Sequence, residues 1–451
     1  MENLQQERTQ EVNTDNMIVG IDVGTTKIAV FVGKKDANGK VSIVGMGKTT
    51  SVGVVHGAVK NIKNTADSIK LAVELAEKKC NIKITEAYVG VAGHNIKNSL
   101  NRSQKIIKEE DHLITEEDIR ELINEQYNRV LSPGESIIDI VPQDYIIDGQ
   151  AGITDPVGYV GKVIEVNYNL ISGDENNIHN IYRSVSMAGY KVKGLILEPI
   201  ASAEAVIDED EKTAGICLVD IGGGTTDMAI FQNGILRHTA VIQLAGNSIT
   251  NDIKETCRIM QYQAEALKTH YGDCLQTESQ QGTIIQIPGL KGREGREVTL
   301  YMLSGIIKAR VEMILQQVDF ELKNGYYDDK ILIAGIVLTG GGSKLEHIAQ
   351  YTQYITGIPT RTGDPDSKWL SDSTSDCCDP MYSTGIGLVL KGFEYEENLN
   401  SHTETKTEET EQTVVEEKPV KNNKENPKTP KGSILDAIKK FFAKVLNDSV
   451  E

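Results

Sequence analysis

"MIVGIDVGTTKIAVFVG", residues 17–33, decides the fold. Two runs of apolar, β-branched residues flank a short glycine–threonine segment, which predicts two strands joined by a tight turn. A related stretch, "CLVDIGGGTTDMAIF", covers residues 217–231. Both stretches have an aspartate at the end of the first strand, then glycine and threonine, then a second strand. An internal duplication is the economical explanation.

Turns of this composition are suited to holding phosphate. Their backbone N–H groups and hydroxyls converge on one point, which is how proteins bind phosphate oxygens. Glycine is needed there because a Cβ would block the approach of the anion. Asp22 and Asp220 would each place a carboxylate beside the phosphates, where it can hold Mg²⁺ through water. A single turn of this kind could equally be an ordinary hairpin.

A third glycine turn, "TGGGSKLEHI", occupies residues 339–348. It follows an apolar run and precedes a helical pattern, which predicts a strand, a turn and a helix. In that context the backbone can approach a base, a ribose or a phosphate closely. Three such turns in one chain favour a nucleotide site over three unrelated hairpins.

Composition limits the class of protein. At 451 residues the chain is too long for one compact domain, and its net charge of −18 argues against general nucleic-acid binding. Six cysteines without a C-x-x-C pair are expected to be reduced structural thiols. The polar first sixteen residues lack the apolar run of a signal peptide. With no stretch of 18 apolar residues anywhere in the sequence, a cytosolic protein is expected.

Helical periodicity is strong in several segments. It predicts helices at residues 64–81 and 114–130, with Thr115 as the N-cap of the second and acidic residues in its first turn. Helix-favouring sequence also dominates residues 249–272 and 299–323.

Five motifs resemble those of a known superfamily. In order, "GIDVGTTKIAV", "LEPIASAEAV", "CLVDIGGGTTDMAIF", "GIVLTGGGSKLEHI" and "MYSTGIGLVL" are similar to the phosphate-one, connect-one, phosphate-two, adenosine and connect-two motifs of the actin-like ATPases. Within that superfamily the chain most resembles the FtsA family of bacterial cell-division proteins. The stretches "VPQDYIIDGQAGITDPVGYVG", "YVGVAGHNIKN" and "RTGDPD" support this resemblance.

The resemblance implies an α/β fold of the actin-like, ribonuclease H-like kind, with duplicated nucleotide-binding domains and an inserted small α/β domain. In the family the insert serves polymer contacts and the recruitment of later division proteins. The first domain is expected at 17–83, 166–197 and 375–395, with the insert at 84–165. The second domain is expected at 198–374 and includes a helical subdomain at about 245–328. Outside the domains we expect a disordered N-terminus at 1–16, a disordered linker at 396–431 and an amphipathic membrane-targeting helix at 432–451.

ATP and Mg²⁺ are the implied cofactors, with Asp22 and Asp220 flanking the magnesium-nucleotide. The residues that would hold the phosphates are Gly24, Thr25, Thr26 and Lys27 on one side and Gly222, Gly223, Gly224, Thr225 and Thr226 on the other. Those that would lie by the adenosine are Gly340, Gly341, Gly342 and Ser343. Gly246 and Asn247 replace a double glycine common in the family, so a nucleotide contact there stays open.

Glu198 matches the connect-one position, where relatives carry a polar residue near the attacking water. A carboxylate beside the γ-phosphate could orient that water. It could equally cap a helix or form a pair at the domain junction. Since division proteins of this family are generally slow ATPases, ATP binding with at most slow hydrolysis is expected.

The helical stretch at residues 301–322 lies where the family binds the C-terminal tail of the tubulin-like division protein FtsZ. That tail is short, with acidic and apolar residues, so its site needs cations beside an apolar groove. Lys308, Arg310 and Arg293 are the candidates. Ordinary solvated charges on a helix are the alternative for each of them.

Residues 434–446 form an amphipathic pattern. Seven apolar residues lie within one arc of about 140° on a helical wheel, and two lysines lie at its borders, where they can reach anionic head groups. The apolar residues are Ile434, Leu435, Ile438, Phe441, Phe442, Val445 and Leu446, and the lysines are Lys439 and Lys444. A helix that docks back on the protein or on a partner is the alternative, and ordering the long polar linker would oppose docking on the protein.

The expected function is that of an ATP-binding, actin-like cell-division protein. It would tether the FtsZ ring to the cytoplasmic face of the inner membrane at the division site as a peripheral protein, bind anionic lipid, polymerise with itself and help to recruit later division proteins. Nucleic acid is not an expected partner. The alternatives are a small-molecule kinase or a pilus-assembly relative of the same superfamily. A chaperone would need a substrate-binding domain after residue 395, where the sequence is polar.

Overall fold

The structure is a computed structural model that describes residues 16–411, apart from 94–95, 109–110, 290, 292–293, 326, 329 and 366–376. The chain divides into two compact units. The first comprises Met1–Ile96 and Gly173–Phe393, and the second comprises Lys97–Ser172 and Glu394–Glu451. The predictions for residues 1–15, for most of the linker and for the membrane helix at 432–451 lie outside the described residues.

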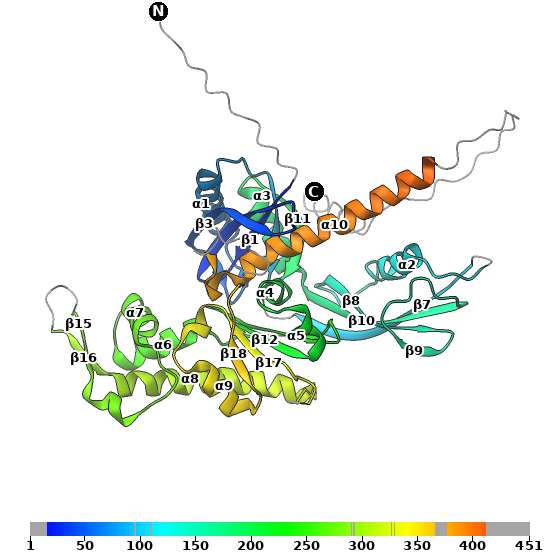
Figure 1. Cartoon of the computed structure of the whole chain (residues 1–451). Helices are drawn as coiled ribbons and strands as arrows, with labels where there is room; N and C mark the ends of the chain where they lie inside the picture. The colour runs from blue at the N-terminus through cyan, green and yellow to red at the C-terminus, as the bar shows by residue number, and fades with distance from the viewer. Residues whose placement is uncertain are drawn as a thin grey trace, which may run out of the picture. The chain divides into compact units, whose positions relative to one another are not determined.

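A five-stranded sheet in the order β11-β6-β1-β2-β3 forms the first half of the first unit (Figure 1). Its strands are β1 (Met17–Val23), β2 (Lys27–Lys35), β3 (Val41–Thr50), β6 (Glu86–Val91) and β11 (Lys191–Leu197). β1 pairs antiparallel with β2 and parallel with β6, and β6 pairs parallel with β11.

Helices cover both faces of this sheet. α1 (Ile62–Cys80) packs on β3, where Gly47 leaves room for the backbone of Ala72. The opposite face contacts α10 (Ser383–Glu411), whose Leu388 lies against Gly20. α3 (Glu175–Met187) packs beside α1.

A second five-stranded sheet, in the order β14-β13-β12-β17-β18, repeats this topology. Its strands are β12 (Ile216–Ile221), β13 (Thr226–Gln232), β14 (Ile235–Ile242), β17 (Gly335–Thr339) and β18 (Thr360–Thr362). β12 pairs antiparallel with β13 and parallel with β17, as β1 does with β2 and β6. Both second strands also carry a bulge, at Val32/Gly33 and at Ile230/Phe231. The predicted duplication and the actin-like fold class are therefore confirmed.

Helices flank the second sheet as well. α4 (Glu198–Val206) and α5 (Glu209–Ala214) contact β12 and β13. The other helices share one hydrophobic core with the sheet; they are α6 (Gly246–Cys257), α7 (Gln261–Tyr271), α8 (Leu300–Asn324) and α9 (Ile348–Thr356). Shorter elements of the unit are β4 (Val54–Val55), β5 (Ala58–Val59), β15 (Ile284–Ile287), β16 (Arg296–Thr299) and the 3₁₀ turns η1 (Glu278–Gly282), η3 (Gly341–Lys344) and η5 (Pro380–Tyr382).

The second unit contains a four-stranded sheet in the order β7-β10-β8-β9. Its elements are β7 (Lys97–Ile106), α2 (Glu116–Gln126), β8 (Glu135–Ile147), β9 (Gln150–Ile153) and β10 (Val163–Asp174). Thr115 is the N-cap of α2, and Asp118 completes a capping box with it, which confirms the predicted start of this helix.

The structure places two boundaries elsewhere than predicted. The insert was expected at 84–165, but the compact unit spans 97–172, because the apolar run of β6 pairs between β1 and β11 in the first sheet. The disordered linker was expected from residue 396, but α10 continues to Glu411. Glutamate, the commonest residue of that stretch, is a good helix former.

The described residues also bear on the cysteines and on hydrophobic helices. Cys80, Cys217, Cys257 and Cys274 are free thiols, as predicted. In the part of the chain that the structure describes, no helix combines the length and the hydrophobicity that crossing a bilayer requires.

Candidate nucleotide site

The two predicted phosphate turns meet in the first unit. A Cβ added to Gly223 would strike the side chain of Thr26, and one added to Gly224 would strike Thr25. The β12–β13 turn is closed by a hydrogen bond from the Gly222 N–H to the carbonyl of Thr225, 3.0 Å apart. The turns at 24–27 and 222–226 are thus brought together, and glycine is required because a side chain would force them apart.

Two buried aspartates lie at the strand ends that lead into these turns. Asp22 is 3% exposed and Asp220 is 8% exposed. Lys27 donates from Nζ to Asp22 Oδ2 at 3.0 Å. Asp220 Oδ2 accepts from the hydroxyls of Ser202, at 2.7 Å, and Thr384, at 3.2 Å. Since Ser202 is in α4 and Thr384 in α10, Asp220 links the second sheet to both helices.

Asp227 is a buried carboxylate that the sequence analysis did not single out. It is the final residue of "DIGGGTTD", and the β12–β13 register places it opposite Asp220. Its Oδ2 accepts from the Thr225 hydroxyl at 2.9 Å. Its Oδ1 is buried without a hydrogen-bond partner among the described residues. The aspartate that ends this motif, where the first copy has Lys27, was the signal that could have identified it.

Glu198, the first residue of α4, lies against β6. A Cβ added to Gly90 would come within 3.1 Å of Glu198 Oε1. Burial raises the pKa of Glu198 well above its usual range, and the charges of Asp22, Asp227 and Asp220 raise it further. The Glu198 carboxyl group is therefore near enough to the aspartates for their charges to act on it.

Excess negative charge shapes the electrostatics of the site. Burial and the nearby Asp220 raise the pKa of Asp227 to about 8. Burial also raises the pKa of Asp220, although the Ser202 hydroxyl and Lys27 oppose the rise. Burial would lower the pKa of Lys27, but Asp22 and then Asp220 and Glu198 outweigh it, so the pKa lies above its ordinary value.

This donor set fits a hard divalent cation. The charges of Asp22, Asp220 and Glu198 act on the Lys27 ammonium group, and Asp227 is buried opposite Asp220. A buried carboxylate oxygen without a partner is an unused ligand atom. Oxygen donors of this kind are those that Mg²⁺ prefers, usually with several waters retained.

The third glycine turn lies against the end of β12. A Cβ on Gly340 would clash with Asp220 and Ile221, and this glycine has a φ of +81°. The Ser343 hydroxyl donates to the carbonyl of Gly340 at 2.8 Å, whereas Gly341 is exposed with open space beside it. Most of this turn forms η3 (Gly341–Lys344), and α9 begins only at Ile348, so the turn does not open the helix directly as predicted.

The Gly246-Asn247 segment is joined to the phosphate turn. The N–H groups of Gly246 and Asn247 donate to the carbonyls of Gly222 and Gly223 at 3.0 and 2.8 Å. From α7, Lys268 donates to the carbonyl of Gly246 at 3.1 Å and pairs with Glu265 at 2.8 Å. The sequence analysis missed these two residues; their i, i+3 spacing beside the motif was the available signal.

The candidate partner residues on α8 have different surroundings. Lys308 Nζ lies 5.6 Å from the centre of the Tyr351 ring. Arg310 donates from Nε and Nη2 to the two oxygens of Asp252, at 2.6 and 2.9 Å, and this hydrogen bonding raises the pKa of Arg310. Arg310 is therefore already paired, and Arg293 lies outside the described residues.

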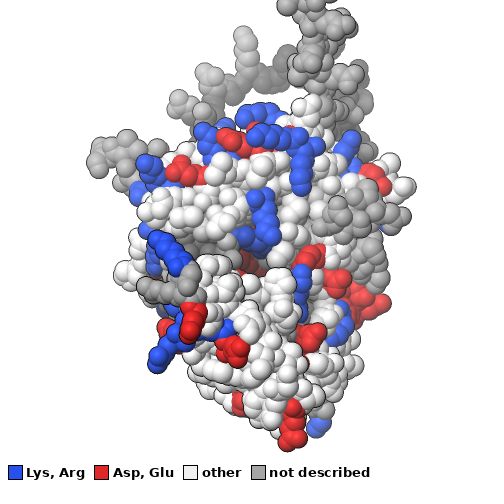
Figure 2. All heavy atoms as spheres, turned by 90° about the vertical axis from the view of Figure 1, so that its left-hand side faces the viewer, with Lys and Arg blue, Asp and Glu red and all other residues white. Residues whose placement is uncertain are grey.

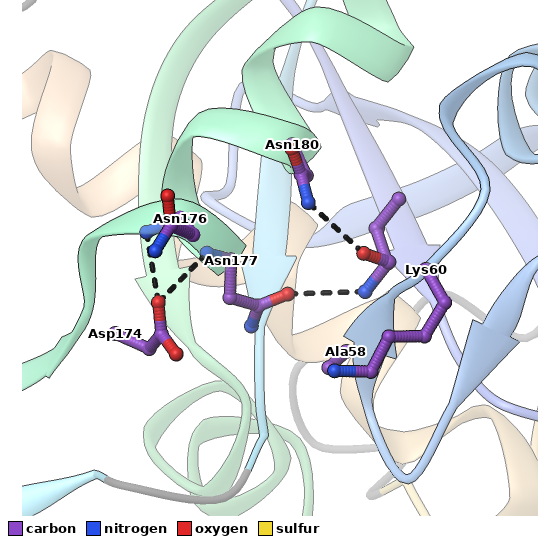
Figure 3. A pocket seen from close by; sticks show the side chains of 7 residues that line it. Ala58, Lys60, Asp174, Asn176, Asn177 and Asn180 are labelled. Carbon is purple, nitrogen blue, oxygen red and sulfur yellow. Dashed lines mark hydrogen bonds between the residues drawn. The ribbon is translucent and has the colours of Figure 1, made fainter.

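A polar pocket lies between β5 and α3 (Figure 3). Two asparagines of α3 point toward the end of β5. Asn177 Oδ1 accepts from the N–H of Val59 at 3.0 Å, and Asn180 Nδ2 donates to the carbonyl of Val59 at 3.1 Å. These amides therefore fasten β5 to α3.

Charge is distributed unevenly over the surface. On the face shown in Figure 2, Lys and Arg side chains gather toward the top, at the height of α1 in Figure 1, and wide uncharged areas lie below. α1 contributes four exposed lysines to the surface: Lys63, Lys70, Lys78 and Lys79. The net negative charge of the chain is thus not spread evenly.

Two family models match the chain. One, described as "Cell division protein FtsA", matches residues 217–387. The other, described as "SHS2 domain inserted in FTSA", matches residues 93–172, close to the compact unit at 97–172.

Curated relatives match over most of their length. The cell division protein FtsA of Neisseria meningitidis serogroup B is 38% identical over 84% of this chain and 91% of that protein. FtsA of Escherichia coli K12 is 32% identical over 86% of this chain and 92% of its own length. FtsA of Bacillus subtilis is 33% identical over 84% of both chains.

Solved structures with low sequence identity share the fold. A PilM–PilN type IV pilus biogenesis complex matches with a TM-score of 0.60 at 15% identity, over 83% of this chain and 98% of the other. MreB 5 of Spiroplasma citri bound to AMPPNP matches with a TM-score of 0.50 at 16% identity, over 86% of this chain and 98% of the other. At these identities the likeness shows the fold alone.

Proposed function

This chain belongs to the FtsA family of cell division proteins, and from that premise we propose that it is an ATP-binding protein that tethers the FtsZ ring to the cytoplasmic face of the inner membrane. The observation that carries the nucleotide part is the meeting of two glycine turns beside four carboxylates inside one compact unit. Family membership also disfavours the small-molecule kinase and the pilus-assembly relative.

The residues divide the work of binding. Asp22, Asp220 and Asp227 would hold Mg²⁺ through water, and the metal would neutralise the charge on the phosphates. The backbone N–H groups and hydroxyls of the turns at 24–27 and 222–226 would bind the phosphate oxygens. Residues 340–343 would lie by the adenosine.

Glu198 is the candidate for orienting water. Burial raises the pKa of its carboxyl well above the usual range, which disfavours the carboxylate form that would accept a proton from water. A cation bound beside it would lower that pKa. Hydrolysis that depends on this group is therefore expected to be slow.

Membrane attachment would come from residues 432–451, whose apolar arc and bordering lysines suit an anionic lipid surface. One helix of this length binds modestly, so self-polymerisation would strengthen attachment by adding anchors. The FtsZ tail would bind beside α8, and the second unit would serve polymer contacts and later division proteins.

Liposome co-sedimentation tests the tether. The full chain and a variant without residues 433–451 are each mixed with anionic vesicles, with and without FtsZ. We expect the full chain to carry FtsZ into the pellet and the truncated variant to leave it in the supernatant. Equal sedimentation of both variants would contradict the proposal. Phe441→Glu in the full chain serves as the matched point variant, because it places a charge in the apolar arc while leaving the chain length unchanged.

A further inference from the structure

His56 stands at a corner that touches both phosphate turns. It donates from Nδ1 to the carbonyl of Gly224, 3.0 Å away, although the two residues are 168 positions apart. The next residue, Gly57, donates its N–H to the hydroxyl of Thr25 at 2.9 Å. The two residues His56 and Gly57 thus form hydrogen bonds to both the β12–β13 turn and the β1–β2 turn.

The backbone at this corner does not explain a histidine. His56 and Gly57 form the two-residue loop between β4 and β5, with φ of +48° and +70°. A hairpin loop with positive φ at both positions favours Asn-Gly, and a residue with a Cβ is strained there. A strained residue at a candidate site is grounds for seeking a role for its side chain.

Hydrogen bonds hold the residues that follow His56 and Gly57 in place. Asn177 and Asn180 of α3 hold both backbone groups of Val59, three residues after His56 (Figure 3). Gly53 accepts hydrogen bonds from the N–H groups of Lys60, at 2.8 Å, and Asn61, at 3.0 Å. The His56 side chain therefore extends from an anchored loop in the first half to a turn in the second half.

We propose that His56 is a positioning residue that clasps the second phosphate turn against the first and so slows the release of bound nucleotide. The inference rests on the proposed function, because it assigns a role at the same nucleotide site. Since a carbonyl oxygen only accepts, the imidazole must carry its proton on Nδ1, and the clasp requires a donor at that position. Opening the turns would break this bond.

Three substitutions of His56 separate the effect of its hydrogen-bond donor from the effect of the strained backbone. Asn and Asp tolerate positive φ better than most residues, and both have the length to place a polar atom near the position of Nδ1. His56→Asn keeps a donor, His56→Asp offers only acceptors at neutral pH, and His56→Gly removes the side chain while relaxing the loop. Asn233→Gly is the matched control, because Asn233 has a φ of +54° in the β13–β14 hairpin, at the end of β13 opposite the phosphate turn.

The experiment measures dissociation of a fluorescent ATP analogue from the full chain, with Mg²⁺ present, by stopped-flow displacement with excess ATP. We expect His56→Gly and His56→Asp to release the analogue about three- to tenfold faster than the natural chain, the factor that one hydrogen bond provides. His56→Asn and Asn233→Gly should stay within about twofold of the natural rate. Melting curves without nucleotide establish that each variant is folded.

The outcomes distinguish a failure of the proposed nucleotide site from a failure of the role proposed for His56. If the natural chain fails to bind the analogue, the proposed nucleotide site is overturned, and the clasp with it. If the natural chain binds but His56→Gly and His56→Asp release at its rate, the clasp alone is overturned. Equal acceleration in His56→Asn and His56→Gly would also overturn it, because a donor at this position would then have no effect.

Discussion

Position 224 requires glycine because the two turns leave no room for a side chain, and not because the backbone there needs a positive φ. No positive φ occurs at this residue, but a Cβ would strike Thr25 in the opposite turn. The threonine cannot retreat freely, because its hydroxyl accepts a hydrogen bond from Gly57. The chemistry of the site therefore depends on a contact between residues of the two halves.

Gly224→Ala should lower the affinity for Mg²⁺-ATP by about tenfold or more, because the added methyl would force the two turns apart. Isothermal titration calorimetry measures the change. Gly282→Ala is the control, since a Cβ there would meet nothing within 4 Å. An unchanged affinity in Gly224→Ala would show that the turns do not need this contact.

Asp227 makes the stability of the nucleotide-free protein depend on pH. Its pKa rises from the ordinary 3.8 to about 8 in the folded protein, chiefly through burial. A group whose pKa is raised on folding contributes stability that is full below the unfolded pKa and is lost as the pH rises through the folded pKa. The contribution of Asp227 to the free energy of unfolding should therefore decline as the pH rises from 3.8 to about 8.

Asp227→Asn removes that ionisation, so we expect the variant to gain melting temperature relative to the natural chain between about pH 5 and about pH 9. Thermal melts in EDTA without nucleotide provide the measurement. Asp67→Asn, at an exposed position of α1, controls for the loss of a carboxylate. Parallel pH profiles for Asp227→Asn and the natural chain would contradict the prediction.

Among secondary-structure elements, α8 carries two of the candidate cations for the FtsZ tail, Lys308 and Arg310, and the two side chains differ in their present partners. Arg310 is held by both oxygens of Asp252 on α6, whereas Lys308 lies over the ring of Tyr351 on α9. A peptide carboxylate would have to displace Asp252 to reach Arg310. Lys308 needs no such exchange of an acidic partner, which makes it the better candidate for the FtsZ tail.

Lys308→Ala should weaken binding of a fluorescent FtsZ tail peptide by about tenfold or more, the loss typical of a hydrogen bond to a charged group. Fluorescence anisotropy with the full chain measures it. Lys323→Ala removes an exposed lysine of the same helix, paired with Asp319, and should leave the affinity unchanged. Equal weakening by both substitutions would indicate a general charge effect and not a site at Lys308.

At the scale of the whole molecule, the candidate nucleotide site lies within the first unit alone. Its residues come from both five-stranded sheets and from α4 and α10, all in the ranges of that unit. The second unit has its own sheet and its own core, and the core includes residues of α2, β8, β9 and β10. Nucleotide binding should therefore stabilise the two units unequally.

Hydrogen exchange tests this difference. Mg²⁺-ATP at about 100 times its Kd adds about 2.7 kcal/mol to the stability of the state that binds it. We expect slower exchange of amides in β1, β2, β12 and β13 and no change in α2 or β8. Equal protection of both units, or protection of the second alone, would contradict the location of the site.

The fold class followed from the resemblance of five motifs to those of the actin-like ATPases. The three glycine turns and the repeated strand–turn–strand pattern were predicted from the residues themselves. These features are local, because strand periodicity, turn composition and the aspartate at a strand end lie within a few residues of one another. Repetition of the same local pattern was enough to predict the duplicated sheets. The start of α2 at Thr115 followed from its capping residues for the same reason.

Only the tertiary structure decided which distant residues share the site. The burial of Asp227, the pairing of Arg310 with Asp252, the bond from His56 to Gly224 and the place of β6 in the first sheet all depend on segments far apart in the chain. A single sequence does not record which surfaces pack together, because packing and burial depend on the complete fold. The chemistry of the turns is thus local, whereas their apposition and charge come from long-range packing.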